Sequence, residues 1–243
     1  MKRGTAEIDP ADRRGDRAIL RGRGRVWLES LEPRTLLSAA VVTYHNDIAS
    51  SGVNSSETLL TPTNLTPGSF GKQFSTPVDG QIYAQPLYVP QSNIAVGLGQ
   101  GTHNVAFVAT EHDTVYAIDA DGGNVLWKTS LLDTSNPAVN LLGAAAIAPV
   151  TPFDVSTLDL SPEIGITATP VIDRAANLIY VEAKSKQTLN GDGGTHYVQM
   201  LYKIDITTGA IVGSTIIGDT SYIVGEPYIH RVVDTGTGTD PFI

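Results

Sequence analysis

The sequence predicts an all-β fold made of short strands and turns. Apolar and polar residues alternate in many short segments, which is typical of half-buried strands. Charged residues make up only 17% of the 243 residues and hydrophobic residues 41%. That balance suits strands and turns better than exposed charged helices. A pattern of motifs also occurs twice in the same order, which indicates a repeated structural unit.

We expect eight strands in two groups of four. The predicted strands are 84–89, 105–110, 115–119 and 124–128, then 168–173, 178–183, 201–205 and 210–212. In each group an Ala-x-Pro segment precedes an apolar strand, and an apolar-Tyr-x-Ile-Asp-x-x-x-Gly segment follows. The offset between copies is 84 at the Pro, 73 at the second strand and 86 at the Asp. The differing offsets predict loop insertions at 137–162 and 186–199.

Four short strands repeated in tandem are typical of propeller blades. A blade cannot bury both of its faces alone, so neighbouring blades stack on it. The prediction is a partial β-propeller within residues 41–243, with four-stranded blades at about 80–130 and 165–217 and an N-terminal strand region. Because a ring needs about four to eight blades, we expect the chain to be a truncated fragment of a larger propeller.

The third strand of the first copy leads into a motif with a clear structural role. Asp119 ends the strand, and its carboxylate is expected to cap the turn that follows. Gly123 supplies the positive φ that the hairpin requires. Trp127 lies on the outermost strand, where its ring is expected to pack across the neighbouring blade.

The second copy keeps only part of this motif. Asp205 and Gly209 preserve the turn, whereas Gly213 stands at the position of the Trp. We therefore expect the second blade to dock less tightly on its neighbour.

Together, Ala117, Asp119, Gly123 and Trp127 form A-x-D-x-x-x-G-x-x-x-W, which resembles the repeat of quinoprotein-type (PQQ-like) β-propellers. That family includes pyrroloquinoline-quinone alcohol dehydrogenases and a non-enzymatic propeller of the outer-membrane assembly machinery. Segments 43–65, 77–90 and 163–173 resemble a bacterial group of PQQ-repeat propellers. The resemblance implies the propeller fold and leaves both activity classes open.

A dehydrogenase of this family implies PQQ, Ca²⁺ bound by Glu, Asn and Asp, a catalytic Asp and a Trp beneath the cofactor. Trp127 belongs to the blade motif and Trp27 to the N-terminal segment, so neither is expected to serve the cofactor. Glu163 and Glu182 lie near strand ends and are candidate ligands, for which a structural role is favoured. We therefore assign no catalytic or metal residue, and PQQ and calcium apply only to the alternative function.

Other polar clusters are interpreted as structural. Residues 190–194, NGDGG, lack the repeated acids of a calcium loop and predict a hairpin tip. Glu111-His112-Asp113 predicts a plain turn, and His45-Asn46-Asp47 predicts polar packing at the start of the globular part. The histidines show no metal-binding spacing (His45, His103, His112, His196 and His230).

Residues 1–40 differ from the rest of the chain and predict a disordered targeting segment. They hold nine Lys/Arg and six Asp/Glu, against seven and nineteen in residues 41–243. Leu31–Ala39 resembles the LEPR-x-L-L-S-A element of exported proteins of planctomycete-type bacteria, which implies export to the cell surface, periplasm or medium. The alternative is a short amphipathic helix over 27–37, which Pro33 disfavours.

The cysteine content, the net charge and the lack of long apolar runs exclude several classes of function. The absence of cysteine excludes disulfides, thiolate metal sites and cysteine nucleophiles. Residues 41–243 carry a negative net charge, which repels nucleic acid. No apolar run in the sequence approaches the roughly 20 residues of a membrane span. The sequence predicts an exported, non-catalytic propeller module that binds proteins or glycans. The alternative is the N-terminal part of a PQQ- and calcium-dependent dehydrogenase.

Overall fold

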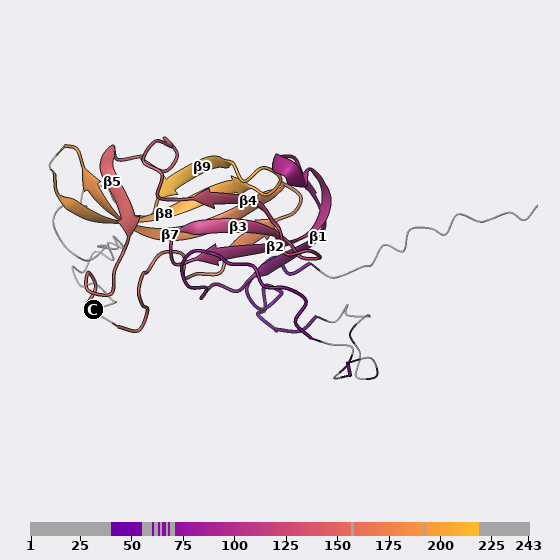
Figure 1. The fold of residues 1–243 in the computed structure, drawn as a ribbon. Coiled ribbons are helices and arrows are strands. Elements are labelled where there is room, and N and C mark those ends of the chain that lie inside the picture. Colours follow the sequence, from indigo (N-terminus) through magenta and orange to yellow (C-terminus); the bar gives the residue numbers. More distant parts are fainter. Residues whose placement is uncertain are drawn as a thin grey trace, which may run out of the picture. The chain divides into compact units, whose positions relative to one another are not determined.

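A computed structural model describes residues 40–54, 60, 63, 65, 66, 68, 71–156, 158–191 and 193–218. Two antiparallel sheets and one 3₁₀ turn, η1 (Gly97–Gly99), make up its regular structure (Figure 1). The first sheet has the order β1-β2-β3-β4, with strands Leu87–Ile94, Gly101–Thr110, Thr114–Asp119 and Val125–Ser130. The second has the order β5-β7-β8-β9, and β6 also pairs with β7. Its strands are β5 Ala144–Pro149, β6 Val171–Asp173, β7 Leu178–Leu189, β8 Thr195–Asp205 and β9 Ile211–Ile216.

The all-β prediction is confirmed. Each of the eight predicted strand segments overlaps an observed strand. Two antiparallel sheets of four and five strands are the arrangement expected of a partial propeller. Within the part of the chain that the structure describes, no helix is long and apolar enough to cross a membrane.

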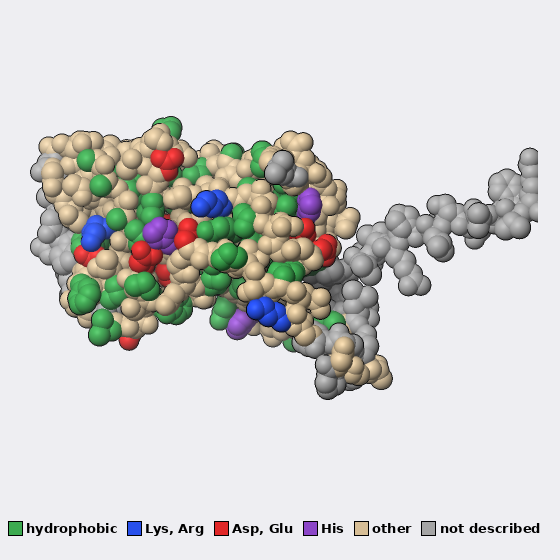
Figure 2. Space-filling model, in the orientation of Figure 1, with side chains coloured by type: hydrophobic (Ala, Val, Ile, Leu, Met, Phe, Trp, Pro, Cys, Tyr) green, Lys and Arg blue, Asp and Glu red, His purple; other side chains and the backbone are tan. Residues whose placement is uncertain are grey.

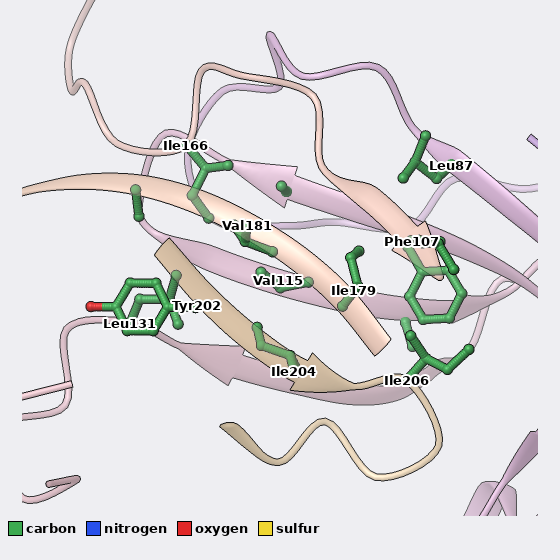
Figure 3. Close-up of a cluster of buried hydrophobic side chains, with 14 of the residues drawn as sticks. Leu87, Phe107, Val115, Leu131, Ile166, Ile179, Val181, Tyr202, Ile204 and Ile206 are labelled. Atoms are coloured by element: carbon green, nitrogen blue, oxygen red, sulfur yellow. The ribbon is translucent and has the colours of Figure 1, made fainter. Parts of the chain in front are cut away.

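One hydrophobic core lies between the two sheets. Phe107 and Val115 from the first sheet belong to the same buried cluster as Ile179 and Tyr202 from the second (Figure 3). Successive side chains of a strand point to opposite faces, and β7 accordingly alternates between buried and partly buried residues along its length. The alternation seen in the sequence therefore becomes the contact surface between the sheets.

Among the described residues of the predicted N-terminal strand region, Val41 and Val42 connect the two sheets. Val41 forms an isolated bridge with Tyr88 of β1, and the neighbouring carbonyl of Val42 accepts a hydrogen bond from Ile172 N of β6 at 2.8 Å. Residues 1–39 of the predicted targeting segment lie outside the described residues.

Both predicted loop insertions turn out to carry strand structure, which corrects the prediction of four strands in the second copy. Residues 186–199 mostly extend β7 and β8 into a long hairpin, and Ala144–Pro149 within 137–162 forms β5 along its edge. The extended β7 exposes unpaired backbone groups, which β5 satisfies despite its Ala-rich sequence.

Asp154, in the loop after β5, fastens that loop to the long hairpin. Its carboxylate lies 2.9 Å from Lys186 Nζ and accepts a hydrogen bond from Tyr197 Oη at 2.9 Å. Burial raises the pKa of Asp154, but hydrogen bonds from Thr151, Lys186 and Tyr197 outweigh it and hold the pKa well below the ordinary value. The hydrogen bonds that lower this pKa are therefore the same contacts that hold the loop on the hairpin.

Candidate functional site

The motif turn of the first copy is closed by its own backbone and by Asp119. Gly123 N donates to Asp119 O at 2.7 Å, and the Asp119 carboxylate accepts from Asp121 N at 3.0 Å. Gly123 has φ +75°, the left-handed conformation that favours glycine. Ala117 is fully buried on β3, directly opposite Trp127 of β4.

Trp127 joins this motif to the turn of the second copy. Its Nε1 donates a hydrogen bond to the carbonyl of Ile206 at 3.0 Å, and its side chain is only 7% exposed. A Cβ atom added to Gly209, which has φ +73°, would lie 2.7 Å from Cδ2 and Cε3 of the Trp ring. Asp205 supports the turn by accepting a hydrogen bond from Thr207 N at 2.7 Å. The glycine is thus required both by its conformation and by the indole above it.

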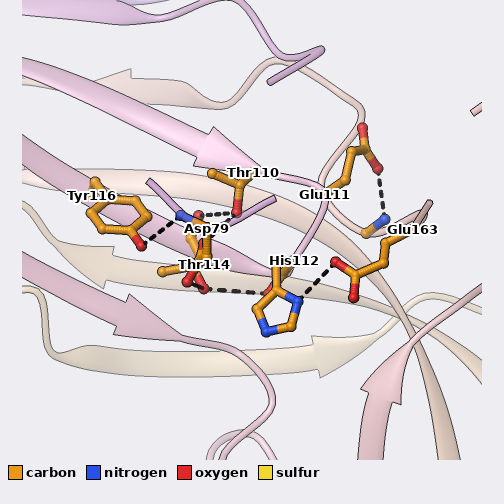
Figure 4. Close-up of polar contacts among 8 residues, drawn as sticks. Asp79, Thr110, Glu111, His112, Thr114, Tyr116 and Glu163 are labelled. Carbon is orange, nitrogen blue, oxygen red and sulfur yellow. Dashed lines mark hydrogen bonds and ion pairs between the residues drawn. The ribbon is translucent and has the colours of Figure 1, made fainter. Parts of the chain in front are cut away.

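A second feature is the junction around the turn between β2 and β3, for which the sequence predicts only a plain turn. The buried Glu111 carboxylate accepts hydrogen bonds from Gly165 N at 2.7 Å and Thr167 Oγ1 at 3.0 Å. His112 Nδ1 lies 2.8 Å from Glu163 Oε2 (Figure 4). The segment before β6 is therefore attached to the first sheet by two acidic side chains.

The same turn is held on its other side by Asp79. The Asp79 carboxylate accepts hydrogen bonds from the hydroxyls of Thr110 and Thr114, each at 3.0 Å, and its backbone N–H donates to Tyr116 Oη at 3.2 Å (Figure 4). Segments from before β1 and before β6 thus meet at one hairpin turn.

Asp113 lies in this junction with no exposed surface, and neither of its carboxylate oxygens has a hydrogen-bond partner among the described residues. A Cβ atom added to Gly165 would lie 2.6 Å from Asp113 Oδ1, so the backbone of Gly165 packs against the carboxyl group. Burial raises the pKa of Asp113 well above its ordinary value, and the charges of Glu111, Glu163 and Glu182 raise it further. The fold therefore favours the neutral acid at this position.

Asp113 also influences Tyr202 of β8. Burial raises the pKa of Tyr202, and Asp113 raises it further when its carboxyl group is ionised. Burial likewise raises the pKa of Glu111, although hydrogen bonds from Gly165 and Thr167 and the positive charge of Lys184 oppose that rise. The junction thus gathers acidic side chains, and Lys184 is the basic side chain whose charge opposes the raised pKa of Glu111.

We expect Asp113→Asn to weaken the decline of stability with rising pH. A carboxyl whose pKa is raised by folding binds its proton more tightly in the native state, so stability falls as pH rises from about 4 through the folded pKa. One such proton contributes at most about 1.4 kcal/mol per pH unit. Urea unfolding at pH 4.5, 6 and 7.5, followed by circular dichroism, should show the variant gaining on the parent as pH rises.

Asp133→Asn is the control for this series. Asp133 is exposed, and hydrogen bonds from Ser135 lower its pKa, so it does not titrate between pH 5 and 8. The difference between Asp133→Asn and the parent should therefore stay constant over that range. A constant difference for Asp113→Asn as well would show that Asp113 is not a buried neutral acid.

The carboxylates of the junction do not fit a calcium ion. No three Asp, Glu or His side chains within the described ranges are placed to hold a metal ion. Glu163 is engaged by His112, and Glu182 accepts a hydrogen bond from Gln199 Nε2 at 2.6 Å. Glu163 and Glu182, which lie apart in the sequence, both lie near this junction. Each is engaged by a neighbouring side chain and so has a structural role.

The remaining candidate histidines do not gather at one site. His103 lies 3.7 Å from the Asp119 carboxylate, His196 is buried on β8, and His230 lies outside the described residues. In the NGDGG segment, Asn190 Nδ2 donates to the carbonyl of Gly143 at 2.8 Å, which ties the hairpin tip to the residue before β5.

A small open pocket of about 240 Å³ lies beside the loop that opens the described globular part. His45, Asn46, Gly52 and Gln85 are among its lining residues. Gln85 Oε1 accepts a hydrogen bond from His45 N at 3.0 Å, which anchors the loop to the segment before β1. The pocket therefore presents amide and imidazole groups on a fixed backbone.

The backbone of this loop is strained at the pocket. His45 and Asn46 have φ of +53° and +76°, a conformation that is uncommon for non-glycine residues. Asn46 Nδ2 donates to Val53 O at 2.8 Å, whereas its buried Oδ1 has no partner among the described residues. Tyr44, half exposed, stacks on the His45 ring with centroids 3.8 Å apart.

A scan against protein-family models finds no match for the chain, and a search of curated proteins finds no similar sequence. The geometry therefore carries the functional argument. The sequence predicts packing for His45-Asn46-Asp47 and does not single out Gln85, which lines the pocket, or Tyr44, whose ring stacks on His45. Gln85 lies forty positions from His45, and no local pattern indicates that the two side chains line one pocket.

Proposed function

We propose that the chain is part of an exported or cell-surface β-propeller repeat protein of the PQQ-like type, a non-catalytic scaffold that binds proteins or glycans. The observation that carries this proposal is the contact of Trp127 with the Gly209 turn. The motif residues serve to stack one unit on the next. Stacked units form a rigid support for binding loops.

The pocket beside Tyr44 is the candidate ligand contact of this scaffold. Amide and imidazole groups of Asn46, Gln85 and His45 suit hydroxyl-rich ligands, and an exposed aromatic ring suits the apolar face of a sugar or a peptide side chain.

A binding experiment with the full chain tests this function. The biotinylated protein should retain ligands on a glycan array or from cell-surface extract, and Tyr44→Ala should weaken that retention by about tenfold or more. Ile48→Ala is the matched control, because Ile48 is a fully exposed apolar residue of the same loop, whereas the Tyr44 ring stacks on His45, which lines the pocket. The proposal fails if the parent retains nothing, or if both variants retain as much as the parent.

Charge favours neutral or basic ligands over nucleic acid. Residues 41–243 hold seven Lys/Arg and nineteen Asp/Glu. On the face shown in Figure 2, basic side chains lie apart from one another and form no continuous patch. Phosphate backbones bind where several Lys and Arg side chains gather.

The alternative function is the N-terminal part of a PQQ- and calcium-dependent dehydrogenase. The acidic side chains of the junction around Asp113 are the feature that favours it, because calcium binds carboxylates. The junction's carboxylates do not fit calcium in the described ranges. Reconstitution of the full chain with PQQ and Ca²⁺, followed by dye-linked alcohol oxidation, tests this alternative. Turnover, or a quinone absorbance that copurifies, would favour the dehydrogenase over the scaffold.

Export makes a separate prediction about the N-terminus. If residues 1–40 act in targeting and are removed, mass spectrometry of exported protein should give an N-terminus between Ala39 and Val42. The small residues Ser38, Ala39 and Ala40 suit such a cleavage site. An intact Met1 on surface-located protein would contradict this prediction.

A further inference from the structure

The tip of the β7–β8 hairpin attaches the start of β5. Asn190 Nδ2 donates a hydrogen bond to the carbonyl oxygen of Gly143 at 2.8 Å, and Asn190 N donates to the same oxygen at 3.3 Å. Gly143 immediately precedes β5, which pairs with β7 at one edge of the second sheet (Figure 1). Through these two hydrogen bonds, one asparagine holds the first residues of an edge strand.

A separate contact attaches the loop that follows β5. The Asp154 carboxylate in that loop contacts Lys186 of β7 and Tyr197 of β8. Between the two attachments β5 consists mostly of alanine, and Ala145 and Ala146 are exposed. Exposed alanine side chains bury little apolar surface, so packing contributes little to holding this part of the strand. Residues 145–146 therefore depend largely on hydrogen bonds, which are those of β7 to β5 and those of Asn190.

The residue after Asn190 makes its side-chain amide chemically reactive. The carbonyl carbon of an asparagine side chain, Cγ, is open to attack by the backbone nitrogen of the following residue. A side chain on that residue hinders the attack, and glycine has none. Of the ten asparagines in the chain, only Asn190 precedes a glycine. The sequence therefore singles out one asparagine for this reaction.

The structure leaves this peptide unit room to react. Asn190 and Gly191 are both exposed, in the turn between β7 and β8. Gly191 N makes no backbone–backbone hydrogen bond with the described residues. No atom lies within 4 Å of the position of a Cβ atom added to Gly191. The turn therefore has space for the Asn190 side chain to approach the nitrogen that attacks it.

We propose that Asn190 is a site of spontaneous deamidation that releases the start of β5. A bond forms between Gly191 N and Asn190 Cγ, and the bond between Cγ and Nδ2 breaks. The side-chain nitrogen leaves as ammonia and takes the proton of Gly191 N with it. Water then opens the resulting cyclic imide, a succinimide, to aspartate or isoaspartate. No group is oxidised or reduced, and water is the only co-reactant.

Either product removes the side-chain contact with Gly143. The Nδ2 group is the donor of that hydrogen bond, whereas the oxygens of a carboxylate only accept. The new carboxylate and the Gly143 carbonyl oxygen therefore repel each other. Isoaspartate also adds one carbon to the backbone of the turn, which displaces the Asn190 N–H. We expect the start of β5 to separate from β7 more often after the reaction.

Peptide mass spectrometry of the full-length protein, aged for weeks at mildly alkaline pH, tests the reaction. Asn190 should convert to a mixture of aspartate and isoaspartate. Asn177, an exposed turn asparagine followed by leucine, should stay largely unchanged. If Asn190 does not convert, or converts no faster than Asn177, the proposal is wrong.

Gly191→Ala is the matched variant for the reaction. Its added Cβ has open space, and Gly191 does not have a positive φ, so the variant should keep the fold. The methyl group hinders attack on Asn190, so most of the conversion seen in the parent should be lost. Conversion at the parent's rate in Gly191→Ala would contradict attack by the Gly191 nitrogen.

Hydrogen exchange tests the consequence for β5. Asn190→Asp reproduces one product, and the amides of residues 145–148 should exchange about five- to thirtyfold faster than in the parent, the effect of losing a hydrogen bond and leaving its acceptor unpaired. Asn177→Asp makes the same change of charge in another turn and should leave these amides unchanged. Equal exchange in Asn190→Asp and the parent would overturn the proposal. Neither experiment involves a ligand, so the outcome is independent of the proposed function.

Discussion

Trp127→Ala should lower the free energy of unfolding by about 3–5 kcal/mol, the range for large-to-small aromatic changes in cores. The indole is buried between the two sheets, contacts Phe107 with ring centroids 5.8 Å apart, and donates its only hydrogen bond to Ile206 O. Domains of this size have about 5–15 kcal/mol of stability, so the loss removes a large part of it. Urea titration followed by circular dichroism measures the effect.

Two variants separate the causes of this loss. Lys128→Ala changes the neighbouring exposed residue of β4 and should alter stability by about 0.5 kcal/mol or less. Trp127→Phe keeps an apolar ring but removes the N–H, so its midpoint should lie between those of the parent and Trp127→Ala. If Trp127→Ala and the parent unfold at the same urea concentration, Trp127 does not hold the sheets together.

Gly209→Ala should lower stability by about 2–5 kcal/mol, the sum of a left-handed backbone conformation that disfavours a Cβ and the overpacking of a filled site. The added methyl group would meet the Trp127 ring at 2.7 Å and Thr129 Oγ1 at 3.0 Å. The ring cannot retreat easily, because its N–H is bound to Ile206 O. The expected result is a lower urea midpoint and partial separation of the sheets.

Gly193→Ala is the matched control for this change. Gly193 has φ +68°, close to the +73° of Gly209, but no atom lies within 4 Å of the position of its added Cβ. Its cost should therefore be the conformational one alone, about 1–2 kcal/mol. Similar costs for both glycines would show that the Trp127 ring does not restrict position 209.

A double variant tests whether the two residues interact directly. In the Trp127→Ala background the ring is absent, so Gly209→Ala should cost about 1–2 kcal/mol less than in the parent. The same unfolding titration measures this coupling. Strict additivity of the two changes would contradict direct packing of the indole on the glycine.

The sequence by itself determined the features that depend on neighbouring residues. The β-branched and aromatic residues of 115–119 and 201–205 predict β3 and β8, because such side chains favour strands. The turns at Asp119 and Asp205 follow from a carboxylate that caps and a glycine that adopts positive φ four residues later. These signals are local, and they predicted the all-β class and the motif turns.

Only the tertiary structure decided the features that depend on distant partners. Ala144–Pro149 has weak strand propensity and becomes β5 because the long β7 offers it an unpaired edge. Asp113 stands in an ordinary turn sequence and becomes a buried acid because Gly165, fifty-two residues later, packs against it. Phe74 lies over Gly123 for the same reason, since a contact between remote segments has no signature in either segment alone. Burial and long-range pairing depend on which surfaces the folded chain brings together. The pattern of neighbouring residues in a single sequence does not indicate those distant contacts.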